Sequence, residues 1–333
     1  MDKKIGIVTL YNACNYGSFL QAFGLQTALE KEGYDTSFIK VPTEYNTIVG
    51  KGDFSDQYVE YEELKYSKLL DDQKKFKCII EANEHMDYCV IGSDTIWNMF
   101  DRAYESLPFF VGRGLNCDKV ISYAASVGQS HWIKILLKNT RKLWPIRKID
   151  CISVRDDKTE RIVHLFGRKC TRVLDPTFLC TFEDQKPDIF IPDKYVLVYT
   201  YGLQESEILN IKEFANKKDL QIVATGSLCD WADYNPVVNS FEWLWLIKNA
   251  SFVITNTFHG TVFSVKYNKE LAVITTTSDK INSLAKELKI NNRICTSENM
   301  TAVFDNKIDY DYINKIISDK VKKSKKYLKE SLK

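Results

Sequence analysis

The stretch IGIVTLYNACNYGSFLQAFGLQTALEKEGYDTSFIKV, residues 5–41, decides the fold class of this chain. It begins with a short, largely apolar run that contains β-branched side chains, which is typical of a buried strand. After a polar loop, apolar residues recur at helical spacing, with Ser18 suited to cap the start of the helix and Gly33 suited to the position after its end. The segment TSFIKV then predicts a second strand. A strand, a helix and a strand in this order predict a parallel sheet with a right-handed crossover.

The alternation of strands and helices continues along most of the chain. Further apolar runs in the first half, YCVIGSD, KVISYAASVG and CISVRDDK, each stop at small or charged residues. A polar, proline-containing stretch at 181–194 predicts a boundary, after which YVLVYT begins a second series of strands and helices. The sequence therefore predicts an α/β protein of two Rossmann-like domains, residues 1–182 and 195–300, whose parallel sheets face a cleft. Because the carboxyl ends of parallel strands line the ligand site, we seek the functional residues there.

Residues 308–333 form a lysine-rich amphipathic pattern. Apolar residues, among them Ile313, Ile317 and Leu328, fall close to one helical face. We interpret the segment as a terminal helix that packs across the two domains. A basic amphipathic helix is also the kind of segment that contacts a membrane surface weakly, and the sequence leaves this alternative open.

The composition excludes several classes of function. The 333 residues include 46 Lys and Arg and 44 Asp and Glu, so the chain lacks the basic excess of a nucleic-acid-binding protein. Nine cysteines are scattered without a C-x-x-C pair or a Cys/His cluster at metal spacing, so we expect reduced thiols in a cytoplasmic enzyme and no metal site. No apolar run has the length of a signal sequence or a membrane span. The chain also lacks G-x-G-x-x-G, G-x-x-x-x-G-K-[ST] and G-x-S-x-G, which weakens the dinucleotide-binding, P-loop and α/β-hydrolase hypotheses.

The segment SFVITNTFHGTVFS, residues 251–264, places His259 between a predicted strand and a predicted helix. We expect the helix to begin near Gly260 and Thr261, whose backbone N–H groups would then point at an anion in the cleft. His259 would supply a proton or a charged hydrogen bond to the same anion. From the pattern alone, a buried histidine hydrogen-bonded to a loop explains the position equally well.

Polar residues follow other predicted strands in the same way. Arg155 can bind a phosphate or carboxylate with its two-pronged guanidinium, or it can form a plain surface ion pair with Asp156 or Asp157. Trp97 would offer a flat platform to a sugar ring. The remaining candidate ligand-binding residues at these positions are Asn15, Tyr16, Gly17, Ser93, Asp94, Asn256 and Thr257.

Taken in order, IGIVTLYNACNYGSFLQAFGLQTALEKEGYD, VIGSDTIWN, SYAASVG, ISVRDDK, VLDPTFL, FEWLWLIKNASFVITNTFHGTVFSVKYNKELAVI and KINSLAKELKINNR resemble the polysaccharide pyruvyl transferase family over most of residues 3–295. The resemblance implies a glycosyltransferase-B-like fold and transfer of pyruvate from phosphoenolpyruvate, as a cyclic ketal, onto two hydroxyls of one sugar. The acceptor would be a glycan-lipid or nucleotide-sugar precursor of a capsule, exopolysaccharide or cell wall, and no metal or other cofactor is expected. In this chemistry His259 would be the general acid or a phosphate ligand, and Arg155 would hold an anionic end of the donor.

One departure from the family pattern concerns the donor. Members that act on known sugars tend to carry an arginine two residues before the histidine, and this chain has Thr257 there. Lys280 and Arg293 are candidates to replace that cation. Two other functions remain open, a nucleotide-sugar glycosyltransferase on the same fold and a non-catalytic relative. The glycosyltransferase hypothesis is weakened because the only glutamates of the second half spaced eight apart, Glu205 and Glu213, fall on what we expect to be a solvated helix face.

Overall fold

The first half of the chain forms a five-stranded parallel sheet in the order β3-β2-β1-β4-β5. The computed structural model describes residues 3–40, 55–98, 107–128, 140–274 and 278–333. The strand-helix-strand unit predicted at the start of the chain is confirmed, because β1 and β2 pair in parallel on either side of α1 in the sequence. The elements of this half are β1 (Lys4–Val8), α1 (Tyr16–Lys31), β2 (Asp35–Ile39), α2 (Asp56–Gln73), β3 (Ile79–Ile80), β4 (Met86–Ile91), α3 (Leu107–Phe110) and β5 (Cys117–Ser122).

A short parallel ladder, β6 (Ser153–Val154) with β7 (Thr171–Arg172), continues the edge of this sheet. Isolated bridges from Ile121 to Cys151 and from Ala125 to Val154 connect this ladder to β5 and to the segment that follows β5. The elements around the ladder are α5 (Thr140–Leu143), the 3₁₀ helix Trp144–Lys148, α6 (Asp157–Leu165) and the 3₁₀ helix Pro176–Phe178.

The second half repeats the architecture with a parallel sheet in the order β12-β11-β10-β8-β9. The second series of strands and helices predicted from YVLVYT onward is present in the described residues. They are β8 (Tyr195–Tyr199), α7 (Glu205–Lys218), β9 (Gln221–Ala224), α8 (Ser240–Asn249), β10 (Phe252–Thr255), α9 (Phe258–Lys266), β11 (Glu270–Ile274) and α10 (Asp279–Leu288), followed by the 3₁₀ helix Asn291–Arg293, β12 (Ile294–Cys295), the 3₁₀ helix Ser297–Asn299 and α11 (Met300–Phe304).

Two helix starts differ from the sequence prediction. Asn15, not Ser18, caps α1, since its side chain accepts a hydrogen bond from the Ser18 backbone N–H. Thr257 caps α9, which begins at Phe258 rather than near Gly260. Both shifts have the same cause, because in each loop a side chain that can accept hydrogen bonds stands one residue before the first helical residue.

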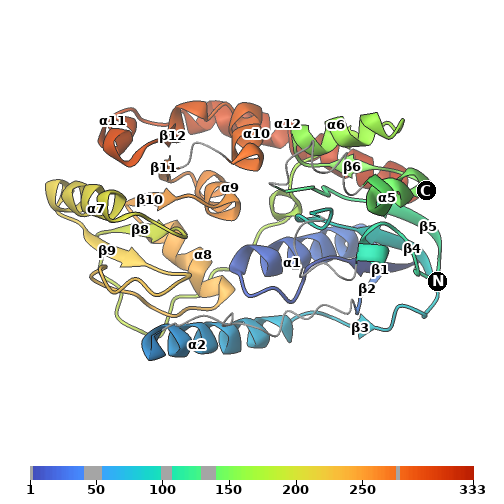
Figure 1. Ribbon diagram of the computed structural model, residues 1–333, viewed down its shortest axis with the longest axis horizontal. Coiled ribbons are helices and arrows are strands. Elements are labelled where there is room, and N and C mark those ends of the chain that lie inside the picture. Colours follow the sequence, from blue (N-terminus) through green and yellow to red (C-terminus); the bar gives the residue numbers. More distant parts are fainter. Residues whose placement is uncertain (1–2, 41–54, 99–106, 129–139, 275–277) are drawn as a thin grey trace.

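The two sheets share one hydrophobic core, in which α1, α8 and α9 lie between them (Figure 1). Tyr16 of α1 stacks on Trp243 of α8, with ring centroids 5.3 Å apart, and Phe19 meets Phe241 edge to face. Aromatic pairs of this kind bury large apolar areas. The contact fixes the first turn of α1 against the second half of the molecule.

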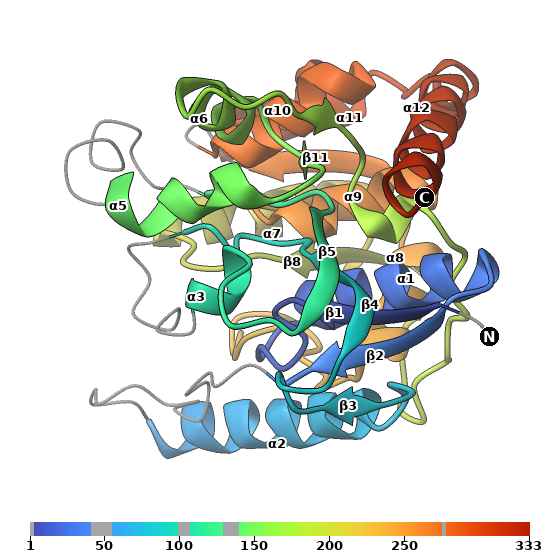
Figure 2. The ribbon, with the colours of Figure 1, turned by 90° about the vertical axis from the view of Figure 1, so that its right-hand side faces the viewer.

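The C-terminal helix α12 (Tyr310–Ser331) packs across both halves, as predicted (Figure 2). Near its start the Tyr310 hydroxyl donates to the Lys269 carbonyl, and near its end the Tyr327 hydroxyl donates to the Ser122 carbonyl. Its apolar side chains Ile313 and Leu328, and Leu332 directly after its end, are buried against the protein. They are therefore occupied in the fold and do not form an outward apolar face. None of the helices within the described part of the chain has the length and apolar character that crossing a bilayer requires.

Candidate active site

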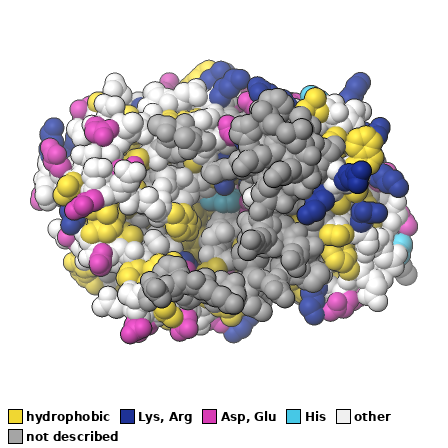
Figure 3. Space-filling model, in the orientation of Figure 1, with side chains coloured by type: hydrophobic (Ala, Val, Ile, Leu, Met, Phe, Trp, Pro, Cys, Tyr) yellow, Lys and Arg dark blue, Asp and Glu magenta, His cyan; other side chains and the backbone are white. Residues whose placement is uncertain are grey.

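A cleft of about 700 Å³ lies where the carboxyl ends of the strands of both sheets meet. Figure 3 shows the face of the molecule hollowed near its middle. The first half contributes the β1–α1 loop, the N-terminal half of α2 and the end of β4. The second half contributes the ends of β8, β9, β10 and β11. The described lining residues are Leu10, Cys14, Asn15, Ser18, Tyr58, Glu62, Lys65, Asp94, Thr95, Tyr199, Tyr201, Ser227, Asn256, Thr257, Phe258, His259, Ile274, Ser278 and Lys280.

His259 lies in the first turn of α9 and packs against the first turn of α1. A Cβ atom built on Gly17 would lie 2.0 Å from His259 Nδ1, so only glycine leaves room for the imidazole. The N-termini of α1 and α9 therefore face each other across the histidine. In the first turn of α9 the backbone N–H groups of Phe258 and His259 have no acceptor within the helix, and a helix N-terminus favours negative charge. The geometry suits an anionic ligand.

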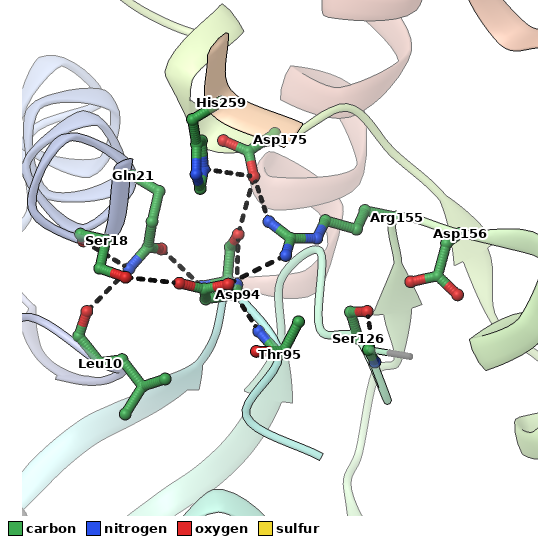
Figure 4. A network of polar contacts seen from close by, with 12 residues as sticks. Leu10, Ser18, Gln21, Asp94, Thr95, Ser126, Arg155, Asp156, Asp175 and His259 are labelled. Atoms are coloured by element: carbon green, nitrogen blue, oxygen red, sulfur yellow. Dashed lines mark hydrogen bonds and ion pairs between the residues drawn. The ribbon is translucent and has the colours of Figure 1, made fainter. Parts of the chain in front are cut away.

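A buried polar network connects His259 to the first sheet (Figure 4). Arg155, which is 4% exposed, donates from Nη1 to Asp175 at 2.6 Å and from Nη2 to Asp94 at 3.0 Å. His259 Nε2 lies 3.8 Å from Asp175 Oδ2, which is ion-pair distance but too long for a hydrogen bond. Ser18 donates to the other oxygen of Asp94. His259 Nε2 itself has no hydrogen-bond partner among the described residues.

The charges of this network hold its carboxylates ionised. Burial by itself would raise the pKa of Asp175, but His259 and Arg155 outweigh it and lower the pKa well below its usual range. Burial opposes ionisation of Asp94 in the same way, and Arg155, His259 and Lys280 overcome it and lower its pKa. For Arg155 burial is again the largest influence, and the two carboxylates raise its pKa above the usual arginine value.

Lys280, in the first turn of α10, extends into the same part of the cleft. Its Nζ lies 5.9 Å from the ring centre of Phe258, over which Arg155 also lies at 4.4 Å. No hydrogen-bond acceptor among the described residues contacts its ammonium group. Burial first, and the charge of Arg155 second, lower the pKa of Lys280. A cation in this state gains from an anionic partner.

The structure brings six of the sequence-predicted site residues to the cleft. They are Asn15, Asp94, Asn256, Thr257, His259 and Lys280.

Three other predicted ligand residues belong to the core instead. Trp97 is fully buried and donates its indole N–H to the Phe110 carbonyl, so it offers no platform to a sugar. Tyr16 is 1% exposed and is occupied by Trp243. Ser93 is fully buried and donates to Asp175, so it supports the network from behind. Whether such a residue faces the cleft or the core depends on the side chains that pack around it. The local sequence does not show which side chains these are.

The cationic and helix-terminus predictions also need correction. Arg155 has both terminal nitrogens bound to Asp94 and Asp175, rather than to Asp156, Asp157 or the cleft. Arg293 is 1% exposed and donates to the backbone carbonyls at 303 and 306, so it does not replace the missing arginine. The N–H of Gly260 is bound by the Thr257 side chain and that of Thr261 by the Thr257 carbonyl, so neither points into the cleft.

Sequence reasoning missed Asp175 and the contribution of α2. Asp175 follows the apolar residues of VLDPTFL, which is the same signal that identified Arg155 and Asp94. Glu62 and Lys65 reach the cleft from α2, where they form an ion pair of 2.6 Å. Their helix precedes β3 in the first half, so no strand-end signal could have identified them.

Comparison with known proteins adds a family and a fold. A family model described as polysaccharide pyruvyl transferase matches residues 15–278. No curated protein sequence matches the chain.

Among solved structures, Arabidopsis thaliana UGT89C1 complexed with UDP is similar at TM-score 0.54 and 10% identity, covering 100% of this chain and 99% of the other. UDP-GlcNAc 2-epimerase from Neisseria meningitidis, bound to UDP-GlcNAc, is similar at TM-score 0.53 and 10% identity, covering 99% of each chain. The glycotransferase of kitacinnamycin gives a TM-score of 0.50 at 12% identity, with 99% and 97% covered. These likenesses show a glycosyltransferase-B-like fold.

Proposed function

The chain belongs to the polysaccharide pyruvyl transferase family, and from this premise we propose that it transfers pyruvate from phosphoenolpyruvate onto two hydroxyls of a sugar and releases phosphate. The acceptor in this proposal is a glycan-lipid or nucleotide-sugar precursor of a capsule, exopolysaccharide or cell wall, and the reaction takes place in the cytoplasm. The observation that carries the proposal is the meeting of His259, Lys280 and two helix N-termini in one part of the cleft. These groups suit a donor that carries both a phosphate and a carboxylate.

Lys280 is our candidate for the cation that the family pattern places two residues before the histidine. Thr257 cannot carry a charge, and its hydroxyl is engaged in capping α9. Lys280 reaches the cleft from the next helix, with no acceptor on its ammonium group among the described residues. A donor phosphate or carboxylate would supply that acceptor.

His259 is our candidate for the general acid. A proton given by its imidazole to the methylene carbon of phosphoenolpyruvate makes the adjacent carbon electrophilic, and an acceptor hydroxyl attacks that carbon. Phosphate then leaves, and the second hydroxyl closes the ketal. The two acceptor hydroxyls lose one proton each. One of these protons returns to His259, which gave a proton to the methylene group, and the other leaves with phosphate. Asp175, ionised and 3.8 Å from Nε2, interacts favourably with the charged ring before the transfer.

The acceptor sugar suits the part of the cleft that α2 lines. In Figure 1, α2 and α10 lie on opposite sides of the molecule. Tyr58, Tyr201 and Ser227 line it with two aromatic rings and three hydroxyl groups, and sugars bind to aromatic faces and hydroxyl partners of this type. Of the described lining residues, Glu62 and Asp94 are the carboxylates, and both oxygens of Asp94 already accept hydrogen bonds. Glu62, of which one oxygen, Oε2, pairs with Lys65 at 2.6 Å, is our candidate to accept a hydroxyl proton.

The test is release of phosphate from phosphoenolpyruvate in the presence of a panel of nucleotide sugars and glycan lipids, with mass spectrometry of the acceptor. We expect release only with a matching acceptor, together with one added pyruvyl ketal. Lys280→Met should raise the KM for phosphoenolpyruvate about 10- to 100-fold, because it removes a hydrogen bond to a charged group. The matched control is Lys286→Met, which removes a 76% exposed lysine of the same helix and should leave KM unchanged.

The second candidate function is transfer of a sugar from a nucleotide sugar, since similar folds are known with UDP and UDP-GlcNAc bound. The pair Glu205 and Glu213 gives it no support, because both residues are exposed on α7 and do not line the cleft. If the acceptor panel yields no phosphate, while a nucleoside diphosphate raises the melting temperature by several degrees, this function replaces the first.

A further inference from the structure

We propose that Glu160, His164 and Cys170 form a zinc-binding site on the outer side of α6, separate from the cleft. One ligand atom from each of the three residues lies within 4.8 Å of the others. None of the three lines the cleft, so this proposal does not rest on the pyruvyl transfer proposed above.

The backbone explains how three separated residues come together. Glu160 and His164 stand four residues apart and so share a face of α6. The helix then ends in a reversal, in which the Gly167 N–H bonds the His164 carbonyl and the Arg168 N–H bonds the Val163 carbonyl. Gly167 adopts a φ of +73°, a conformation that costs glycine nothing. The reversal returns Cys170 to the end of α6, where its Sγ lies 3.9 Å from His164 Nε2.

The donor set identifies the metal. A thiolate, an imidazole and a carboxylate are the ligands that Zn²⁺ takes in tetrahedral sites, at roughly 2.0–2.3 Å, which places ligand atoms about 3.5 Å apart. Cys170 Sγ lies 3.9 Å from His164 Nε2, and all three ligand atoms lie within 4.8 Å of one another. Side-chain rotations, which the exposed His164 can make, would bring them to this value. Three protein ligands leave a fourth position for water. Calcium and magnesium, which prefer oxygen ligands, suit the set poorly.

The neighbouring groups allow metal binding. Binding of Zn²⁺ would displace the proton of the Cys170 thiol and form the sulfur–zinc bond. Arg172 is the competing cation, 3.6 Å from Glu160, but the same nitrogen is held more closely by Asp157 at 2.9 Å. Glu160 can therefore give up its long contact with Arg172 and bind the metal instead.

A metal at this position would stabilise the segment that holds the active-site network. Arg155 follows β6 directly, and Asp175 lies shortly after β7. The connection between these two strands consists of α6 and the reversal that ends it. A metal bound by Glu160 and His164 of α6 and by Cys170 would cross-link the two ends of this connection. It would thereby hold the β6–β7 ladder in place beneath the site.

The experiment adds Zn²⁺ or Co²⁺ to the metal-free full-length protein at neutral pH. We expect about one equivalent of tightly bound metal, and with Co²⁺ a near-ultraviolet thiolate-to-cobalt charge-transfer band. Cys170→Ser should abolish the band, and His164→Ala should weaken Zn²⁺ binding at least tenfold. The controls are Cys78→Ser and His85→Ala, which remove an exposed cysteine and an exposed histidine elsewhere and should change neither result.

Two results would overturn the proposal. The first is the absence of a thiolate band in the wild-type protein at saturating Co²⁺. The second is an unchanged band in the Cys170→Ser variant, which would assign the metal to other cysteines. Phosphate release from phosphoenolpyruvate is not part of either readout, so failure of the zinc site and failure of the pyruvyl transfer proposal are distinguishable.

Discussion

At the scale of the single residue, the site depends on Gly17, which has no side chain. Gly17 stands in the first turn of α1 with an ordinary helical backbone, so its role is not conformational freedom. Its role is space, because the His259 imidazole occupies the volume that a Cβ atom would fill. The histidine thereby lines the cleft, while its buried Nε2 faces Asp175 at 3.8 Å and has no hydrogen-bond partner among the described residues.

Gly17→Ala therefore tests the position of the imidazole without removing it. Alanine is a better helix former than glycine, but its Cβ would overlap the His259 ring, so we expect the clash to dominate and to lower stability by about 1–3 kcal/mol. The displaced imidazole should lower kcat by about 10²-fold or more, toward the loss expected for His259→Ala, which lies in the range of roughly 10²–10⁴ for a general acid. Phosphate release and thermal unfolding measure the two effects. Full activity in either variant would remove His259 from the mechanism.

At the scale of the element, α2 is the helix whose position could not be foreseen. It belongs to the first half of the sequence, but its buried face contacts the second half. Tyr61 accepts from the Gly226 N–H, Lys65 donates to the Gly226 carbonyl, and Asp72 accepts from the Ser240 N–H at the start of α8. Glu62 and Lys65 reach the cleft because these contacts hold the helix across it.

Asp72→Ala should lower the free energy of unfolding by about 1–3 kcal/mol, because it leaves a buried backbone N–H at the start of α8 without a partner. Urea denaturation measures the change. The neighbouring Asp71→Ala is the matched control, since Asp71 is 66% exposed and pairs with the exposed Lys74, and we expect a change within about 0.5 kcal/mol. Equal effects of the two substitutions would contradict the structural role of the Asp72 contact.

At the scale of the whole molecule, the two halves are joined by a shared core, by α2, by α12 and by the buried charges around Arg155. These charges make the stability of the fold depend on pH. Asp175 and Asp94 have folded-state pKa values below the ordinary 3.8, so below that pH the unfolded chain takes up protons before the folded chain does. Their contribution to stability is complete above pH 3.8 and is lost as the pH falls toward the folded values.

We therefore expect the free energy of unfolding to fall as the pH is lowered below about 4, measured by urea denaturation at a series of pH values. His259→Ala removes one of the charges that lower the pKa of Asp175, so its acid-dependent loss should be smaller than that of the wild type. Asp118→Asn, which changes a 70% exposed carboxylate, should retain the wild-type pH dependence. A wild-type stability that does not change over this range would contradict the buried-charge network.

The sequence by itself determined most of the strands and helices, the parallel sheets and the terminal helix that crosses them, but not the short strands β3, β7 and β12. The elements that it determined follow from local periodicity and turn residues, which each segment carries within a few positions. It also determined that His259 stands where a strand ends and a helix begins.

Only the tertiary structure decided which strand-end residues face the cleft. Asp94 and Lys280 reach it, whereas Trp97 and Arg293 are buried, although all four follow or flank similar patterns. The physical reason is that burial and charge pairing depend on neighbours from distant parts of the chain. Arg155 could be predicted to need an anion, but its partners Asp94 and Asp175 come from other strands, and only the folded molecule brings them together.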